Sequence, residues 1–317
     1  MIKTFAIMGA AGYVAVQHLR AIKNCSANLL AAFDPHDSVG VLDQYFPQAA
    51  FFTEFERFER HVNKLSRIGN GQHVEYISIC TPNYLHDSHI RFSLNAGANA
   101  ICEKPMVLNT WNLDALAAAE AKTNKKVFNI LQLRFHPAII KLKEQVNALK
   151  SNTKFEVNLT YISPRGNWYF NSWKGEEAKS GGIITNIGVH FFDMLHHLFG
   201  SVQQNNLHYK DQYRAGGFIE FEKARVRWFL SVNPADMPQN STKATFSKYR
   251  ALKINEQEID FTEGFADLHT SVYGDILSGG GFGIEDARTA IKIVSDLRVS
   301  NAKAVLADLH PALHSYC

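Results

Sequence analysis

The stretch that decides the fold of the N-terminal half is Thr4-Phe5-Ala6-Ile7-Met8-Gly9-Ala10-Ala11-Gly12-Tyr13-Val14-Ala15. It joins an apolar run to an amphipathic helix through a glycine-rich turn. Gly9 permits the tight turn, Gly12 lets a phosphate approach the backbone, and Ala15 lets the helix pack close to the sheet. The spacing G-x-x-G-x-x-A is one residue longer than the common dinucleotide-binding pattern, and an ordinary strand–helix turn is the alternative interpretation.

Apolar runs and helical patterns alternate from this stretch onward. The alternation predicts a doubly wound sheet of parallel strands that are buried on both faces, as in a Rossmann fold. The expected strands are Thr4–Met8, Asn28–Phe33, Val74–Cys80, Asn99–Glu103 and Lys126–Ile130, and the expected helices are Tyr13–Lys23, Glu54–Ile68, Leu85–Ala96 and Trp111–Thr123.

The second half alternates like antiparallel strands with one wet face, which predicts an α+β domain on a largely antiparallel, open-faced sheet. We therefore expect a dinucleotide-binding domain over 1–134 and a domain for substrate binding and oligomerisation over 135–317. The open face is expected to join copies of the chain into a dimer or tetramer. The expected strands are Phe155–Tyr161, Asn205–Lys210, Gly217–Phe221, Arg225–Val232, Thr242–Ser247 and Ala251–Asn255, with helices at Pro137–Leu149 and Asp286–Ser300.

Composition excludes several classes of protein. With 317 residues, 46% hydrophobic and 20% charged, the chain has the make-up of a soluble globular protein. Its formal net charge of +3 is too small for binding nucleic acid through phosphate contacts, although it suits an anionic small ligand. The four cysteines lack metal-ligand spacing, and neither a signal peptide nor a membrane-spanning run is present, so we predict a cytoplasmic protein.

Asp34 indicates which cofactor the glycine loop would bind. It ends the second strand, where a carboxylate accepts from adenosine ribose hydroxyls and repels a 2′-phosphate. The following Pro35-His36-Asp37 offers no arginine for that phosphate, so NAD is favoured over NADP. Thr81-Pro82-Asn83 ends another strand at the same edge, and a helix-start cap is an equally compatible interpretation there.

Lys104 and His190 are the candidates for chemistry. Glu103-Lys104-Pro105 ends the fifth strand, and a residue before proline is held out of the helical region, so Lys104 has a defined direction. A lysine beside a nicotinamide can polarise an alcohol oxygen. The alternative interpretation of Glu103-Lys104-Pro105, taken on its own, is a surface turn. Oxidising an alcohol also needs a group that takes the hydroxyl proton, which His190 could supply.

The whole chain resembles the glucose–fructose oxidoreductase / inositol dehydrogenase (Gfo/Idh/MocA) family. The shared motifs are the loop at Gly9, Thr81-Pro82-Asn83, Glu103-Lys104-Pro105 and Gly181-Gly182…Asn186…His190. One branch is the UDP-N-acetyl-2-amino-2-deoxy-D-glucuronate dehydrogenases of bacterial O-antigen and lipopolysaccharide synthesis, which oxidise the sugar C3 hydroxyl to a ketone. The chain is similar to that branch at Gly9–Ala15, Asp34–Asp37, Ser78–His86 and Gly283–Arg288.

The resemblance implies a role for each matched residue. Lys104 would contact the reacting hydroxyl and His190 would be the general base, although either of the two could be the base. Asn186 stands where many relatives carry aspartate, and an amide can only orient the sugar or His190. The implied cofactor-binding residues are Gly9, Ala11, Gly12, Tyr13, Val14, Asp34, His36, Thr81, Pro82, Asn83, His86, Glu103, Lys104 and Gln132.

A basic-aromatic loop precedes the histidine motif. Its charges could clamp a diphosphate or carboxylate while its rings cover the sugar or uracil, and a mixed solvent loop is the alternative. We predict that substrate binds to Lys104, Arg165, Trp168, Tyr169, Lys174, Asn186 and His190. No metal is expected at His190, Asp193 and His197, because apolar residues interleave them. Gln132 and Arg134 end the sixth strand, where a cofactor or substrate contact and simple capping are both open.

The leading hypothesis is therefore NAD-dependent oxidation of the C3 hydroxyl of UDP-N-acetyl-glucosaminuronic acid. A dehydrogenase of a free sugar or cyclitol is the alternative among enzymes. A non-catalytic NAD-binding regulator is the alternative from another class, and the presence of both Lys104 and His190 argues against it.

Overall fold

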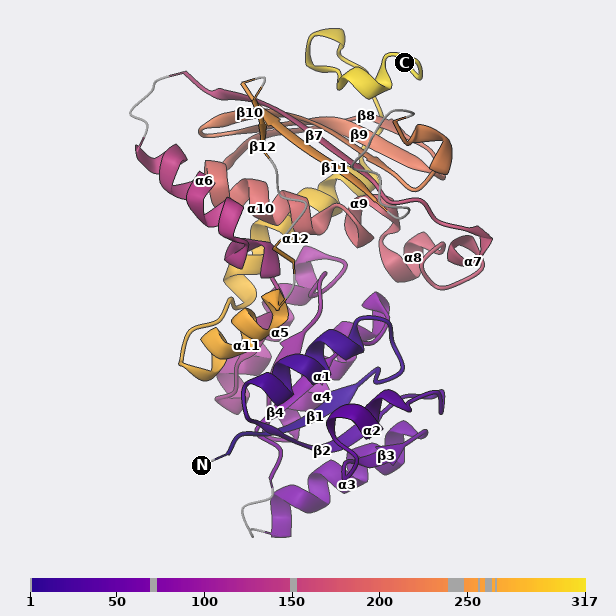
Figure 1. The fold of residues 1–317 in the computed structure, drawn as a ribbon, viewed down its shortest axis with the longest axis vertical. Helices are drawn as coiled ribbons and strands as arrows, with labels where there is room; N and C mark the ends of the chain where they lie inside the picture. Colours follow the sequence, from indigo (N-terminus) through magenta and orange to yellow (C-terminus); the bar gives the residue numbers. More distant parts are fainter. Residues whose placement is uncertain are drawn as a thin grey trace. The chain divides into compact units, whose positions relative to one another are not determined.

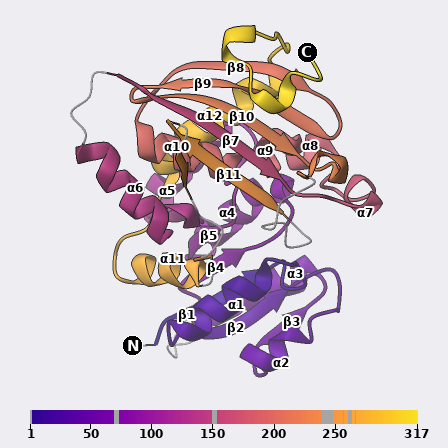
Figure 2. The same ribbon diagram turned by 45° about the horizontal axis from the view of Figure 1, so that its top comes forward.

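The computed structural model describes residues 2–68, 73–148, 153–238, 248–255, 257–259, 264–265 and 267–317 (Figures 1 and 2). The chain divides into two compact units. Unit 1 comprises residues 1–132 and 267–288, and unit 2 comprises residues 133–266 and 289–317. This division differs from the predicted domains 1–134 and 135–317 because a late segment returns to unit 1, where helix α11 (Leu268–Leu277) packs on helix α1 (Ala15–Asn24).

Unit 1 contains the predicted doubly wound sheet. Six parallel strands lie in the order β3-β2-β1-β4-β5-β6, so the strand order reverses beside β1, where ligands bind in sheets of this kind. The strands are β1 (Thr4–Met8), β2 (Asn28–Phe33), β3 (Ala50–Phe52), β4 (Tyr76–Ile79), β5 (Asn99–Cys102) and β6 (Val127–Asn129). Besides α1 and α11, the helices are α2 (Val41–Tyr45), α3 (Phe55–Ile68), α4 (His86–Asn95) and α5 (Thr110–Thr123).

Unit 2 is built on a second six-stranded sheet in the order β12-β11-β7-β10-β9-β8. Its pairs are antiparallel except for β7 and β10, which are parallel. The predicted strand Thr242–Ser247 lies outside the described residues. The strands are β7 (Phe155–Ile162), β8 (Val202–Lys210), β9 (Arg214–Phe221), β10 (Ala224–Ser231), β11 (Tyr249–Ile254) and β12 (Gln257–Ile259). The remaining helices are α6 (Pro137–Ala148), α7 (Asn167–Phe170), α8 (Glu177–Ser180), α9 (Gly182–Asn186), α10 (Val189–Phe199) and α12 (Ile284–Val299).

The two faces of the unit 2 sheet are covered differently. Because side chains alternate along a strand, Trp228 and Phe229 of β10 point to opposite faces. Trp228 packs on Phe192 of α10, with ring centroids 5.2 Å apart. Phe229 packs instead on Leu309 and Leu313 of the C-terminal tail, which Figure 1 shows on the side of the sheet away from α10. The face that was predicted to be open is therefore covered in part by the chain's own tail.

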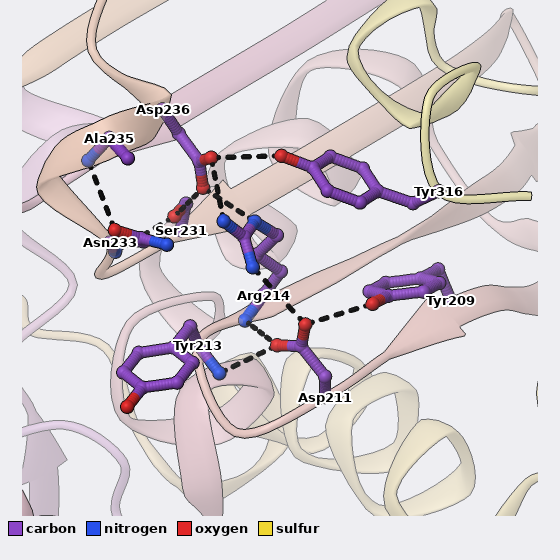
Figure 3. Close-up of polar contacts among 9 residues, drawn as sticks. All are labelled: Tyr209, Asp211, Tyr213, Arg214, Ser231, Asn233, Ala235, Asp236 and Tyr316. Carbon is purple, nitrogen blue, oxygen red and sulfur yellow. Dashed lines mark hydrogen bonds and ion pairs between the residues drawn. The ribbon is translucent and has the colours of Figure 1, made fainter.

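Arg214 at the start of β9 holds this tail by charge (Figure 3). Its guanidinium donates two hydrogen bonds to Asp236, at 2.8 and 2.9 Å, and one to Asp211, at 3.3 Å. Tyr316 donates its hydroxyl to the Asp236 carboxylate at 3.0 Å, and the guanidinium lies 4.7 Å from the centroid of the Tyr316 ring. Tyr209 donates to Asp211 from the neighbouring strand. The end of the chain is thereby joined to β8 and β9.

Candidate functional site

The glycine loop makes a tight turn between β1 and α1. Gly9 has a φ of +86°, and a Cβ at this residue would lie 2.7 Å from the Cys80 carbonyl carbon and 2.8 Å from the Thr81 nitrogen. Gly9 therefore serves both the turn and its close approach to the end of β4. Gly12 donates its N–H to the Gly9 carbonyl at 3.1 Å, and Ala15 donates to the Gly12 carbonyl at 3.0 Å, so the loop winds directly into α1.

Asp34 fastens this loop to the end of β2. It is buried, and its two carboxylate oxygens accept from the backbone N–H groups of Ala11 and His36, each at 2.9 Å. Each carboxylate oxygen has a second lone pair, so it can still accept from a ribose hydroxyl. Tyr13, by contrast, is 97% exposed, and Val14 caps α1 without a side-chain hydrogen bond.

Two buried histidines contact the loop after β4. The Thr81 hydroxyl lies 2.9 Å from His89 Nδ1. His86 is fully buried, with Nδ1 2.7 Å from the Pro105 carbonyl oxygen and Nε2 2.8 Å from the Thr81 carbonyl oxygen. Because both ring nitrogens face backbone carbonyls, His86 would influence a cofactor through the loops it braces. Asn83 is buried beside Thr81.

Glu103 is fixed inside unit 1 just before Lys104, and the Lys104–Pro105 peptide is cis. One carboxylate oxygen lies 3.0 Å from His18 Nε2 and 2.9 Å from His269 Nε2, and the other accepts from the Lys104 backbone N–H at 3.1 Å. Burial opposes ionisation, but the hydrogen bonds from His18 and His269 hold the pKa of Glu103 well below its ordinary value. Sequence reasoning missed both histidines, because His269 lies 166 residues from Glu103 and belongs to no motif.

Gln132 follows β6 at the same edge of the sheet. Its Oε1 is buried, and no hydrogen-bond partner for it occurs in the described part of the chain. A buried amide oxygen of this kind is suited to accept from an amide NH₂ such as that of nicotinamide. With the glycine turn and Asp34, it gives unit 1 groups that fit a dinucleotide.

In unit 2, Asn186 and His190 lie on successive helices, α9 and α10. Gly181 has a φ of +79°, and a Cβ there would lie 2.5 Å from Thr185 Cβ, so this glycine lets α9 begin directly against α8. Asn186 donates to the Tyr169 hydroxyl at 3.4 Å. His190, one helical turn later, is partly exposed.

Arg134 lies in unit 2 and has a structural partner. Its guanidinium donates to both oxygens of Asp193 of α10, at 3.1 and 2.7 Å. The two side chains are only 7% and 2% exposed. Asp193 thus belongs to an internal ion pair that anchors the helix carrying His190.

In the basic-aromatic loop, the cationic side chains lie close to aromatic rings. The Arg165 guanidinium lies 6.0 Å from the Trp168 ring centroid and 5.9 Å from that of Tyr169, and Lys174 Nζ lies 5.8 Å from Trp168. Burial lowers the pKa of Lys174. Arg165 Nε is buried without a hydrogen-bond partner among the residues described. Beside the loop is a cavity of about 210 Å³ whose lining includes Tyr169, Lys174, Gly181, Gly182 and Arg214.

The predicted residues therefore form two groups. The cofactor residues and Lys104 lie in unit 1, and the substrate loop, Asn186 and His190 lie in unit 2. Among the described residues, no helix combines the length and the hydropathy needed to cross a bilayer.

Comparison with known proteins matches both units to one family. Residues 3–130 match the oxidoreductase family's NAD-binding Rossmann fold, and residues 143–235 match its C-terminal alpha/beta domain. The scyllo-inositol 2-dehydrogenase (NADP(+)) IolW of Bacillus subtilis is 23% identical over 168 residues, which cover 50% of this chain and 46% of that protein. The chain spans about half the length, or less, of the first curated relatives it matches.

Solved structures match over nearly the full length. The WlbA (WbpB) dehydrogenase from Thermus thermophilus, in complex with NAD and UDP-GlcNAcA, is 43% identical, with a TM-score of 0.93, covering 98% of this chain and 99% of that one. The WlbA dehydrogenase from Chromobacterium violaceum, with NADH and UDP-GlcNAcA, shares the fold at 16% identity and a TM-score of 0.74, covering 94% of this chain and 93% of that one. The chain belongs to the Gfo/Idh/MocA oxidoreductase family, with an NAD-binding Rossmann domain followed by the family's C-terminal α/β domain.

Proposed function

We propose that this protein oxidises the C3 hydroxyl of UDP-N-acetyl-glucosaminuronic acid, with NAD as hydride acceptor, in bacterial O-antigen sugar synthesis. The observation that carries the proposal is the 43% identity, over nearly the whole of both chains, to a dehydrogenase in complex with NAD and UDP-GlcNAcA. Lys104, Asn186 and His190 of this chain can supply the groups that such an oxidation needs.

NAD is supported by the groups in unit 1. The glycine turn leads into the start of α1, where a pyrophosphate binds in folds of this kind, and Asp34 can accept from a ribose hydroxyl. The buried oxygen of Gln132, which has no hydrogen-bond partner among the described residues, can accept from the carboxamide. When bound, NAD supplies the nicotinamide carbon that takes the hydride. The carboxylate of Asp34 disfavours a 2′-phosphate, so NAD is preferred to NADP.

Lys104 and His190 then divide the work on the hydroxyl. The ammonium of Lys104 donates to the reacting oxygen and stabilises the negative charge that develops on it. His190 accepts the hydroxyl proton, a role that an imidazole can fill. Asn186 orients the sugar or the imidazole and carries no proton itself.

The basic-aromatic loop is suited to the anionic substrate. UDP-N-acetyl-glucosaminuronic acid carries a diphosphate and a C6 carboxylate, which require more cations than Lys104 alone. Arg165 has a buried Nε–H that meets no acceptor in the part of the chain that the structure describes, and Lys174 lies half-buried near aromatic rings. We infer that these two residues bind the anionic groups and that Trp168 and Tyr169 cover the sugar or uracil.

The proposal also extends to assembly and location. We propose that the protein forms a homo-oligomer through the part of the unit 2 sheet that the C-terminal tail leaves uncovered. We also propose that it is cytoplasmic. Free thiols at Cys25, Cys80, Cys102 and Cys317 are consistent with a reducing compartment.

A free-sugar or cyclitol dehydrogenase is the second candidate. The inositol 2-dehydrogenase of Rhizobium meliloti is 25% identical over 62% of this chain. Such substrates lack the diphosphate and carboxylate, so they would leave Arg165 and Lys174 without an anionic partner.

The test is an absorbance assay at 340 nm with purified protein and NAD. We expect NADH to form with UDP-N-acetyl-glucosaminuronic acid and far more slowly with UDP-N-acetylglucosamine, which lacks the C6 carboxylate, or with myo-inositol. Because the WlbA (WbpB) dehydrogenase from Thermus thermophilus has also been solved in complex with NAD and alpha-ketoglutarate, the assay is repeated with that 2-oxo acid to detect reoxidation of the cofactor in place. Faster turnover of inositol or a free hexose than of the UDP-uronate would contradict the proposal and favour the second candidate.

A further inference from the structure

A buried chain of hydrogen bonds runs through the core of unit 1. Ser78 Oγ lies 2.6 Å from the Tyr273 hydroxyl, which lies 2.7 Å from His18 Nδ1. His18 Nε2 lies 3.0 Å from Glu103 Oε1, and His269 Nε2 lies 2.9 Å from the same oxygen. Ser78, His18 and Tyr273 are fully buried, and the His269 side chain is 12% exposed.

All the hydrogen bonds from Ser78 to Glu103 are donated in the same direction. Burial lowers the pKa of His18, so its ring is neutral, and burial raises the pKa of Tyr273 well above its ordinary value, so it stays a phenol. Tyr273 therefore donates to His18 Nδ1, and His18 donates its Nε2–H to the ionised Glu103. Ser78 donates to Tyr273. Each of these atoms has a partner of the right kind, so the chain is satisfied as it stands.

This series of hydrogen bonds ends at the backbone of Lys104. Glu103 Oε2 accepts from the Lys104 N–H at 3.1 Å, and Asn129 Nδ2 donates to the Glu103 carbonyl at 3.3 Å. On the far side of the lysine, His86 Nδ1 lies 2.7 Å from the Pro105 carbonyl oxygen. Buried side chains thus fix the residues before and after Lys104. Such support matters at a reacting group, where a shift of about 1 Å can lower the rate by about 10².

We propose that His269 and Tyr273 are positioning residues for Lys104 and act on it through Glu103. The inference rests on the proposed function for the role of Lys104 in catalysis. Both residues belong to α11, in the segment that returns to unit 1 from the second half of the chain. The dinucleotide-binding unit is thereby completed, beside its reactive lysine, by residues outside its contiguous N-terminal part.

Bound metal is the competing interpretation of the same cluster. The ligand-type atoms of His18, Glu103 and His269 all lie within 4.8 Å of one another, a set that could hold a divalent cation. The hydrogen bonds require no cation, however, because each histidine has an N–H to donate and Glu103 has the charge to receive both. A test of the proposal must therefore include removal of metal.

Four single variants of the full chain separate positioning from mere packing. His269→Met removes the donor and keeps the bulk, His269→Gln keeps an N–H donor, and Tyr273→Phe removes only the hydroxyl. Thr270→Ala is the matched control. Thr270 lies on the same helix, but its hydroxyl accepts from Asn24, which does not belong to the buried series of hydrogen bonds.

We expect kcat to fall about 10- to 100-fold in His269→Met and Tyr273→Phe, with KM for NAD changed by less than about threefold. His269→Gln should recover most of the lost rate, and Thr270→Ala should match the wild type. A merely structural role would not produce this rescue by glutamine at constant KM.

Amide hydrogen exchange provides a readout that needs no substrate. The Lys104 N–H is bonded to Glu103, so the peptide that contains it should exchange slowly in the wild type and in Thr270→Ala, and faster in His269→Met and Tyr273→Phe. If the exchange changes as expected but the UDP-uronate is not oxidised, the proposed function fails and the positioning stands. Three results would overturn the inference. The first is wild-type kcat and wild-type exchange of the Lys104 N–H in His269→Met and Tyr273→Phe. The others are equal impairment in His269→Gln and His269→Met, and faster exchange of the wild type on treatment with EDTA.

Discussion

Replacing Asp193 by asparagine removes the carboxylate that pairs with the Arg134 guanidinium, a group with almost no access to water. Arg134 and Asp193 join through two hydrogen bonds, with side chains 7% and 2% exposed. Breaking a buried pair by removing one partner costs about 3–5 kcal/mol, because the other charge stays buried. We therefore expect Asp193→Asn and Arg134→Met each to lower the free energy of unfolding of unit 2 by about that much. The double variant Arg134→Met/Asp193→Leu should lose far less than the sum, since it buries no charge.

Urea unfolding followed by tryptophan fluorescence measures this loss. Trp228 of β10 is a suitable reporter because it is fully buried against Phe192 of α10, the helix that carries Asp193. Asp296→Asn is the control: Asp296 pairs with Lys292 on α12, where the two side chains are 48% and 66% exposed. An exposed pair of this kind contributes less than about 1 kcal/mol. If Asp193→Asn cost no more than the control, or if the double variant lost the full sum of the single variants, the argument from burial would be refuted.

Further expectations concern the cofactor, the chemistry, the substrate loop and the C-terminal tail. Asp34→Ala should weaken NAD binding and narrow its advantage over NADP in fluorescence titrations, and a wild type that binds NADP as well as NAD would contradict this. Lys104→Ala and His190→Asn should each lower kcat by roughly 10²–10⁴ with the Kd for NAD preserved, and near wild-type rates in both would place the chemistry elsewhere. Arg165→Ala should raise the calorimetric Kd for the UDP-uronate by about tenfold or more, with NAD binding unaltered, and an unchanged Kd would exclude this residue from the anion site. Burial lowers the pKa of His310 to about 3, so the unfolded chain binds a proton that the folded chain does not, and stability should fall as pH falls from about 6.5 toward 3. In His310→Gln the slope of the melting temperature against pH over that window should be shallower, and an identical slope would show that His310 does not titrate on unfolding.

The sequence was sufficient for the parallel sheet of unit 1 because its strands are continuous apolar runs. Phe5, Ile7, Ile77 and Ile101 are fully buried, and strands buried on both faces read as such in any sequence. Strand β3 gave no comparable signal, since Ala50–Phe52 has only three residues, all partly exposed. The glycine turn could be located because a positive φ and a close backbone approach both require glycine at one position, Gly9.

What the sequence could not predict were contacts between distant segments. His18 lies on the apolar face of α1, but nothing in the sequence pairs it with Glu103 or places His269 and Tyr273 beside both. Likewise, Arg134 reads as a residue at a strand end, and only the fold brings it to Asp193, 59 residues later. Such pairings depend on how elements pack, which periodicity and spacing do not encode.

The C-terminal tail shows the same limit from the opposite direction. The alternation of the strands predicted an open face on the unit 2 sheet, whereas Phe229 of β10 is buried there against the tail. The tail that covers part of it has no amphipathic period, because Leu309 and Leu313 lie in a segment of short 3₁₀ turns. An irregular segment can bury two side chains in a sheet without a pattern that sequence reasoning detects.

The central claim is the proposed transfer of the hydrogen on C3 of the nucleotide sugar to NAD, a reaction that we expect to require both Lys104 and His190. It is tested most directly with UDP-N-acetyl-glucosaminuronic acid deuterated at C3, incubated with the protein and NAD, followed by mass spectrometry of the NADH formed. The account predicts that the NADH carries the deuterium, that the sugar product is the 3-ketone, and that Lys104→Ala and His190→Asn form both far more slowly. NADH without deuterium, or no NADH from this substrate while a free sugar is oxidised, would contradict it.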